Sequence, residues 1–193
     1  YENIENKLIP VLAKMELEGI KVDLKYFETY KIELQEKIKK LEEEIYLLAG
    51  EKFNIGSPKQ LAEILFEKLE IEPVKKTKTG YSTDVEVLEA LALREISIAE
   101  KLLEYRSYAK LLSTYVEPLP KLVDENSRIH TTFNQNGTST GRLSSTNPNL
   151  QNIPSKTEEG MKIRKGFVSK EGYSFISFDY SQIELRVLAE LSK

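Results

Sequence analysis

The sequence predicts an α+β fold, in which a long helical arm is attached to a smaller part that contains strands. Through about the first 120 residues, apolar side chains recur every three or four positions, as they do in amphipathic helices. Pro118 and Pro120 end this helical run. Beyond them, aromatic and β-branched runs alternate with polar segments, which is typical of strands and loops. Helices in one part of a chain and strands in another indicate the α+β class.

Two helices are predicted at the start of the chain. The first ends at Gly19, and its apolar stripe consists of Ile4, Leu8, Val11, Leu12 and Met15. Asp23 is suited to capping a second, much longer helix, which Gly50 ends. The stripe of this second helix consists of Phe27, Tyr30, Leu34, Ile38, Leu41, Ile45 and Leu48. Such a stripe packs against a neighbouring helix, so we expect a protruding antiparallel arm.

Three more helices complete the predicted arm. Ser57 at the N-cap and Pro58 at the first helical position begin one of them. Residues 72–83 are rich in Pro, Lys and Gly and predict an exposed loop. Asp84 is the expected cap of the next helix, and a longer helix follows it to about Glu117.

The part after Pro120 is predicted to contain strands around a long polar segment. Ile129–Phe133 and Tyr173–Phe178 have the aromatic and Ile content of strands, and the lone His130 takes an ordinary strand position. Residues 134–154 form a 21-residue polar segment, and a stretch of this kind inside a compact domain is more often functional than not. Residues 161–165 predict a short helix.

Composition excludes several classes of protein. No signal peptide is visible, and no apolar run approaches the ~18 residues of a membrane span, so no membrane partner is expected. Cysteine is absent, which excludes disulfides and thiolate metal sites and predicts a cytoplasmic protein. Acidic residues are mostly Glu, basic residues are mostly Lys, and only two Met occur, a pattern typical of thermophilic proteins.

The chain is acidic overall, but its charges are unevenly distributed along the sequence. The net charge of −3 argues weakly against a nucleic-acid partner. Residues 128–170, however, contain seven basic and two acidic side chains, whereas residues 1–50 contain eleven acidic side chains and eight lysines. The local excess is suited to phosphates, but by itself a cluster of this kind is more often only a solvated face.

A carboxylate follows the last predicted strand. Asp179 stands between that strand and a final helix, for which Ser181 and Glu184 have the spacing of a capping box. A carboxylate facing a helix N-terminus at a sheet edge can hold Mg²⁺ while phosphates complete the coordination. The residues alone leave open whether Asp179 does this or merely caps the helix.

A second segment has the composition of a nucleic-acid contact. Thr140-Gly141-Arg142-Leu143-Ser144-Ser145 is followed by Pro148-Asn149-Leu150-Gln151-Asn152. Arg, Asn and Gln side chains supply paired donors suited to minor-groove acceptors and to sugar–phosphate oxygens. An Asn-rich surface loop of no function would have the same composition.

Both segments resemble family A DNA polymerases of the bacterial polymerase I type. Residues 179–186, Asp-Tyr-Ser-Gln-Ile-Glu-Leu-Arg, resemble motif A of that family, and residues 140–154 resemble its conserved primer–template segment. The resemblance implies a first palm-side helix at 1–22, a helical thumb at 23–119 and part of an antiparallel-sheet palm at 120–193, without the fingers.

The resemblance also implies roles in catalysis. Asp179 would be one of two carboxylates that hold a pair of Mg²⁺ ions, with the backbone carbonyl of Tyr180 as a further ligand. Glu184 would lie under the sugar of the incoming nucleotide and exclude a 2′-hydroxyl, which favours dNTPs. The implied dNTP-binding residues are Tyr180, Ser181, Gln182, Ile183 and Glu184.

A further implication is a set of contacts to primer–template DNA. Those near the nascent base pairs would be Arg142, Asn149, Gln151 and Asn152. Minor-groove acceptors are nearly alike for all correct pairs, so these contacts would check pair shape without choosing sequence. Thumb contacts to backbone phosphates would be Arg106, Lys110, Ser82, Thr83 and Ser57, which are sequence-blind and salt-sensitive.

The resemblance further implies missing parts. The fingers helix and the second catalytic carboxylate of the family lie beyond Lys193, so we expect no polymerisation by this chain alone and a C-terminal fingers and palm portion as its partner. Two other functions stay open: a non-catalytic DNA-binding module derived from a polymerase, and a structural helical clamp that binds no nucleic acid.

Overall fold

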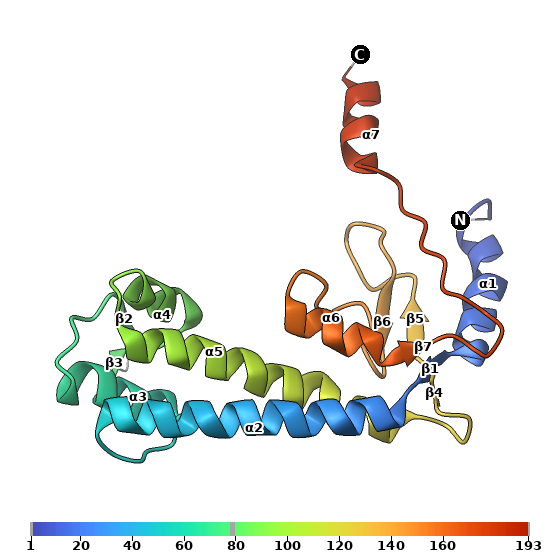
Figure 1. The fold of residues 1–193 in the computed structure, drawn as a ribbon. Coiled ribbons are helices and arrows are strands. Elements are labelled where there is room, and N and C mark those ends of the chain that lie inside the picture. Colours follow the sequence, from blue (N-terminus) through green and yellow to red (C-terminus); the bar gives the residue numbers. More distant parts are fainter. Residues whose placement is uncertain (1, 78–79, 193) are drawn as a thin grey trace.

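The structure, a computed structural model, describes residues 2–77 and 80–192, and it confirms the α+β class. A helical arm projects from a base that contains the strands (Figure 1). The arm is built on α2 (Leu24–Ala49), which is about 39 Å long at 1.5 Å per residue. Helix α5 (Ser97–Leu111) and its π-helical continuation η2 (Leu112–Val116) run beside it.

Helix α2 begins and ends where the sequence predicts. The Asp23 carboxylate accepts the backbone N–H of Tyr26 at 2.9 Å, and Gly50 adopts a left-handed φ of 74°. Most of the predicted stripe is buried, but Leu48 is 41% exposed and Ala49 is buried in its place. A straight helix drifts relative to a repeat of three and four, so the end of a long stripe rotates away from the core.

The arm tip is built from short elements. They are α3 (Pro58–Ala62), the π-helix η1 (Glu63–Lys68), α4 (Val85–Ala92), and the strands β2 (Lys76–Thr77) and β3 (Gly80–Tyr81). Ser57 and Asp84 are the N-caps, as predicted. The loop predicted for residues 72–83 is wrong in part, because β2 and β3 pair antiparallel; Lys78 and Thr79 lie outside the described residues. Tyr81 packs edge-on against Phe66, with ring centroids 5.3 Å apart, and this contact holds the hairpin on the tip.

The base contains two small antiparallel sheets. The first has the order β4 (Arg128–Ile129), β1 (Ile20–Val22) and β7 (Phe167–Val168), and the second pairs β5 (Thr132–Asn134) with β6 (Ser144–Thr146). The predicted strand Ile129–Phe133 is therefore divided between two sheets. Sequence analysis missed the central strand β1, which is too short to show a period.

Three helices surround these sheets. They are α1 (Glu5–Glu18), the 3-10 helix η3 (Leu119–Leu122) and α6 (Glu158–Lys165). Helix α6 begins before the predicted residue 161, because the hydroxyl of Thr157 accepts the backbone N–H of Gly160 at 3.1 Å and caps it. Among the described helices, none combines the length and the apolar character needed to cross a membrane.

Two predictions for the C-terminal segment are wrong. Residues 173–178 are extended but unpaired within the described chain, and Phe178 is 91% exposed. Strand propensity alone does not make a strand when no neighbour supplies its hydrogen bonds. Helix α7 (Ile183–Leu191) has Gln182, not Ser181, at its N-cap, and no side chain caps it. Figure 1 shows α7 standing apart from the base.

Two hydrophobic cores lie at opposite ends of α2. The tip core includes Ile45 of α2 with Leu61, Leu88 and Leu102, whereas the base core includes the residues Val22, Phe27, Tyr30, Leu34, Leu111, Tyr115, Val116, Leu119, Ile129, Ile153 and Ile163. The sequence predicts domain boundaries after residues 22 and 119, and the base core contains residues from both sides of each boundary. The arm and the strands are thus packed together, while the expected domain division at those positions stays a prediction.

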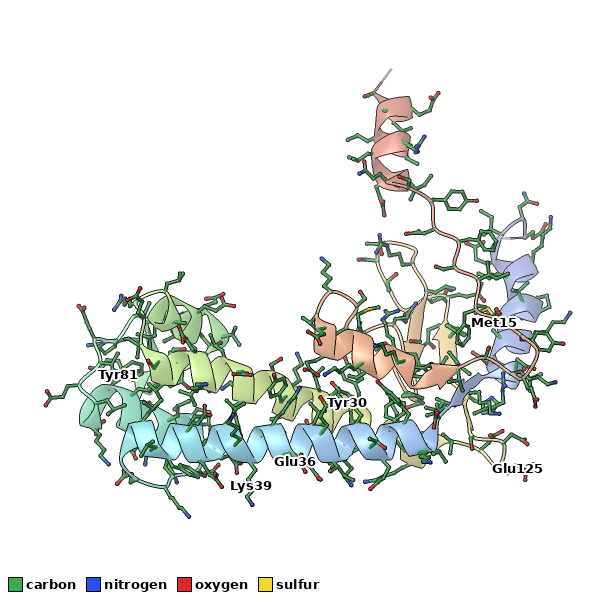
Figure 2. The ribbon with its side chains drawn as sticks, viewed as in Figure 1. Met15, Tyr30, Glu36, Lys39, Tyr81 and Glu125 are labelled. Carbon is green, nitrogen blue, oxygen red and sulfur yellow. The ribbon has the colours of Figure 1, made fainter. Side chains whose placement is uncertain are left out.

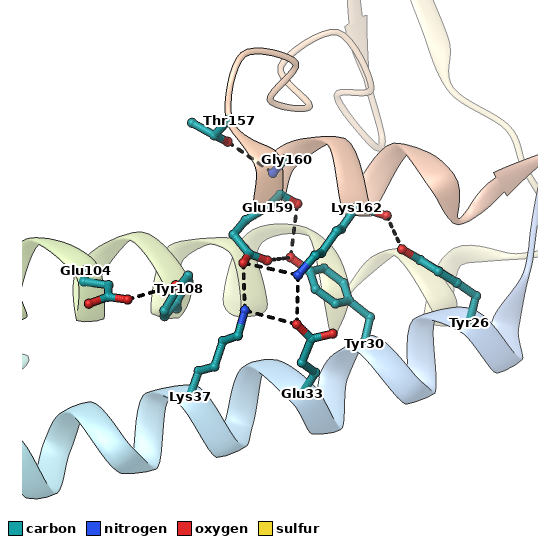
Figure 3. A network of polar contacts seen from close by, with 10 residues as sticks. All are labelled: Tyr26, Tyr30, Glu33, Lys37, Glu104, Tyr108, Thr157, Glu159, Gly160 and Lys162. Carbon is teal, nitrogen blue, oxygen red and sulfur yellow. Dashed lines mark hydrogen bonds and ion pairs between the residues drawn. The ribbon is translucent and has the colours of Figure 1, made fainter.

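A polar network also joins the arm to the base (Figure 3). The Glu159 carboxylate accepts the Tyr30 hydroxyl at 2.8 Å and the Lys37 ammonium at 2.7 Å, and Lys162 pairs with Glu33 at 2.9 Å. Burial opposes ionisation of Glu159, but the hydrogen bonds from Lys37 and Tyr30 outweigh it and lower the pKa of this carboxyl. Five side chains of α2 and α6 therefore hold the two helices in one orientation.

His130 links α1 to the base through both ring nitrogens. Nδ1 lies 2.7 Å from the Glu16 carbonyl oxygen, and Nε2 lies 3.3 Å from Asp124 Oδ2. Both partners are acceptors, so both bonds form only when the imidazole is protonated. The bond to Glu16 and then that to Asp124 raise the pKa of His130 above 6.5, whereas burial and the nearby Arg128 oppose this increase.

We expect His130→Gln to reduce stability more at pH 5.5 than at pH 8.5. A folded pKa above the unfolded value stabilises the fold fully below about 6.5, and this contribution disappears as pH rises through the folded pKa. Urea midpoints of both proteins at both pH values measure the difference. His130 is the one histidine of the sequence, so it dominates titration in this window. An equal loss at both pH values would contradict the assignment.

Candidate nucleic-acid interface and catalytic segment

An open groove at the arm tip collects the five predicted contacts of the arm. It has a volume of about 1310 Å³ and is lined by Ser57, Ser82, Thr83, Arg106 and Lys110, among others. These residues come from the N-terminus of α3, the turn after β3, and α5. Figure 2 marks this end of the arm by Tyr81, which also lines the groove. The fold thus brings together side chains up to 53 positions apart in the sequence.

Several of these polar groups have partners inside the protein. Arg106 Nη1 donates to the Thr83 carbonyl oxygen at 2.5 Å, and burial lowers the pKa of its guanidinium. The Ser82 hydroxyl accepts the N–H of Asp84 at 3.2 Å, and the side chains of Ser82 and Thr83 are buried. Lys110 is exposed on the same face of α5, one turn beyond Arg106. Lys110 is therefore more available to a ligand than Arg106 is.

The charge of the groove is mixed. Three basic and three acidic side chains line it: Lys59, Arg106 and Lys110, and Glu63, Glu67 and Asp84. Two of the acids have basic neighbours, since Asp84 lies 3.3 Å from Lys75 and Glu63 lies 4.0 Å from Lys59. Sequence analysis assigned no role to Lys59 or Ser113, which also line the groove. The signal for Ser113 was its position three residues after Lys110, on the same helical face.

The second set of predicted DNA contacts lies on the base. Arg142, Asn149, Gln151 and Asn152 are exposed there, on the segment that flanks β6. The Asn149 carboxamide oxygen accepts the backbone N–H of Gln151 at 3.0 Å, and Gln151 Nε2 donates to the Leu143 carbonyl oxygen at 3.3 Å. The Asn149 side chain therefore stabilises the turn that contains Gln151, as Asn side chains commonly do. This set and the groove lie at opposite ends of the arm (Figure 1).

One ion pair joins this segment to the predicted catalytic segment. Arg142 Nη2 lies 2.7 Å from Glu184 Oε1, although their side chains are 74% and 69% exposed. The backbone N–H of Glu184 and then Arg142 lower the pKa of this carboxyl. Asp179, Tyr180, Ser181, Gln182 and Ile183 precede it, and all are exposed. The pair is open to water, so it contributes little to stability and is easily exchanged for another partner.

The donor chemistry around Asp179 is suited to Mg²⁺ but incomplete. A carboxylate and the Tyr180 carbonyl are hard oxygen donors of the kind Mg²⁺ prefers, and exposure leaves room for water or phosphate oxygens. Within residues 2–77 and 80–192, no group of three or more His, Cys, Asp or Glu side chains could hold a metal ion. Further oxygen ligands would come from water, from bound substrate or from another polypeptide segment.

Comparison with known proteins decides the family. The sequence profile of DNA polymerase family A matches residues 24–193. The chain belongs to this family. The chain is 56% identical over 194 residues to DNA polymerase I of Caldicellulosiruptor bescii. This match covers 100% of the chain but only 23% of that relative. For DNA polymerase I of Bacillus subtilis the identity is 53% over 195 residues, with coverage of 100% and 22%.

A solved family A structure has the same fold. The POL domain of Pol1 from M. smegmatis, determined in complex with DNA primer-template and dNTP, superposes with a TM-score of 0.84 and 46% identity. The match covers 94% of this chain and 32% of that one. The mixed helical and antiparallel architecture is therefore that of part of a polymerase domain.

Proposed function

We propose that this chain is the thumb and the first part of the palm of a DNA-directed DNA polymerase that grips primer–template DNA. The observation that carries the proposal is the convergence of Ser57, Ser82, Thr83, Arg106 and Lys110 on one groove, in a chain whose family is DNA polymerase family A. The thumb would be residues 23–119, and the palm part residues 120–193.

Two surfaces would divide the binding of DNA between them. The groove at the arm tip would hold backbone phosphates, mainly through Lys110 and Arg106, independently of sequence. The exposed amides of Gln151 and Asn152, with Arg142, would contact the minor groove near the primer terminus. Because the surfaces lie at opposite ends of α2, a duplex that reaches both would be held along the length of the arm.

Nucleotidyl transfer would use Asp179. Its carboxylate and the Tyr180 carbonyl would hold Mg²⁺, and the segment Ser181–Glu184 would line the site of the incoming dNTP. Bound Mg²⁺ would supply activation of the primer 3′-hydroxyl and neutralisation of the leaving pyrophosphate. The chain spans 22 to 23% of the two relatives described above, and we propose that a further portion of the polymerase supplies the second carboxylate and the fingers.

Lys110→Gln is expected to weaken binding of primer–template DNA and to reduce its salt dependence. Loss of one phosphate contact lowers the slope of log K against log salt by about 0.9. Fluorescence anisotropy at several salt concentrations measures both quantities. Lys39→Gln is the matched control, because Lys39 is an exposed lysine of α2 that does not line the groove (Figure 2). Equal slopes for the wild type and both variants would count against a phosphate-binding groove.

Glu184→Ala is expected to relax the exclusion of ribonucleotides in the complete polymerase. A single steric contact in a substrate pocket is worth about 10- to 200-fold in discrimination, so the ratio of kcat/KM for dNTP over rNTP should fall by that factor. Primer extension with each nucleotide measures the ratio. Glu190→Ala, on the same helix, should leave it unchanged. If discrimination persists in Glu184→Ala, the selectivity resides in another residue.

A further inference from the structure

We propose that Tyr115, Thr131 and Arg164 are positioning residues that fix residues 146–154, and through them the side chains of Gln151 and Asn152, against the base of the arm. The inference rests on the proposed function, in which those two side chains contact the primer terminus. It concerns three side chains outside the set of predicted DNA contacts.

The three side chains all donate to backbone carbonyl oxygens of this segment. The Tyr115 hydroxyl donates to the Asn152 carbonyl oxygen at 2.6 Å. The Thr131 hydroxyl lies 3.1 Å from the Thr146 carbonyl oxygen and 2.7 Å from that of Pro148. Arg164 donates through Nη2 to Ile153 and through Nε to Pro154, each at 3.2 Å. Five carbonyl groups in nine residues thus lie within hydrogen-bond distance of side-chain donors from elsewhere in the sequence, and two of them share the single proton of the Thr131 hydroxyl.

The donors are themselves held in place. Tyr115 and Thr131 are each 7% exposed, and Tyr115 belongs to the base core together with Ile153. Ser145, 1% exposed, accepts the N–H of Leu150 at 3.2 Å from below the turn. A buried donor with one defined acceptor restrains that acceptor more than an exposed one, because water cannot replace it at low cost.

The outer side of the same segment is exposed to solvent. Asn149, Gln151 and Asn152 are exposed, while their backbone is fastened beneath them. An amide that must test the shape of a base pair has to be held to within about 0.5 Å, and rigid support from neighbouring residues is the usual means. In this arrangement the exposed amides contact the base pair, and three donors hold them in place: the buried Tyr115 and Thr131, and Arg164 through its two hydrogen bonds.

The decisive variant is Tyr115→Phe, which removes only the hydroxyl and keeps the buried ring. We expect the chain to lose about fivefold in affinity for a matched primer terminus, the effect of one hydrogen bond, while its affinity for a mismatched terminus and its salt slope are unchanged. Tyr108→Phe is the matched control: its hydroxyl donates to Glu104 at 3.0 Å on α5 and does not touch residues 146–154.

Thr131→Val provides a second test that preserves shape, and it should lower the ratio of matched to mismatched affinity in the same way. Amide exchange at residues 149–153 should accelerate in both variants and not in Tyr108→Phe. Faster exchange with an unchanged ratio would show a merely structural role and overturn the proposal, as would an equal loss of both affinities. If the wild-type chain binds matched DNA preferentially and the variants do too, the positioning role fails and the proposed function survives. A wild-type chain without affinity for duplex DNA would overturn both.

Discussion

Asp179→Asn is expected to abolish primer extension by the complete polymerase while leaving its affinity for primer–template DNA nearly intact. A metal ion at such a site stabilises several kcal/mol of transition-state charge, so losing the carboxylate should reduce kcat by about a thousandfold or more. Asp179 is exposed and lies beyond both hydrophobic cores, so the substitution should not disturb the fold. Single-turnover extension and anisotropy, measured on the same preparation, separate chemistry from binding.

The experiment also separates this chain from a DNA-binding module without catalysis. Extension should be measured with the chain alone and with the remaining polymerase core added in trans. Asp179→Asn should remove the activity that the addition restores, whereas Glu171→Gln, an exposed acid outside residues 179–186, should not. Restored activity in Asp179→Asn would mean that Asp179 holds no essential metal ion. Extension by the chain alone would show that its own residues complete the site.

Phe27→Ala is expected to lower the free energy of unfolding by about 4 kcal/mol, through the loss of buried surface and the cavity that remains. The Phe27 side chain is 1% exposed and packs edge-on against Phe167, with ring centroids 6.1 Å apart. It also lies against Gly166, where an added Cβ atom would clash with the Phe27 ring. The contact between Phe27 of α2 and Phe167 of β7 joins the arm to the base. Urea denaturation followed by circular dichroism measures the loss.

Two further variants keep this prediction testable. Leu47→Ala, at a position of α2 that is 83% exposed, should change stability by no more than about 0.5 kcal/mol. Phe27→Leu retains most of the volume and should cost only about 1.5 kcal/mol, so it reports on the site if Phe27→Ala does not fold. Similar losses for Phe27→Ala and Leu47→Ala would mean that the arm is not anchored through this contact.

Sequence alone determined the features that depend on neighbouring residues. Asp23 and Gly50 delimit α2, and Ser57 and Asp84 cap α3 and α4, because a cap acts within three or four positions of itself. The motif at residues 179–186 and the polar segment at residues 140–154 pointed to the family that the profile match confirms. These signals are local in the chain and need no knowledge of the fold.

Only the tertiary structure decided the features that depend on distant partners. Ile20–Val22 becomes the central strand because β4 and β7 pair with it, whereas Tyr173–Phe178 has stronger strand propensity and stays unpaired among the described residues. Neither the groove that brings Ser57 near Lys110 nor the bond from Tyr115 to the Asn152 carbonyl oxygen follows from any local pattern of residues. A backbone carbonyl is the same in every residue, so the side chain that will bind it is chosen by folding and not by the local sequence.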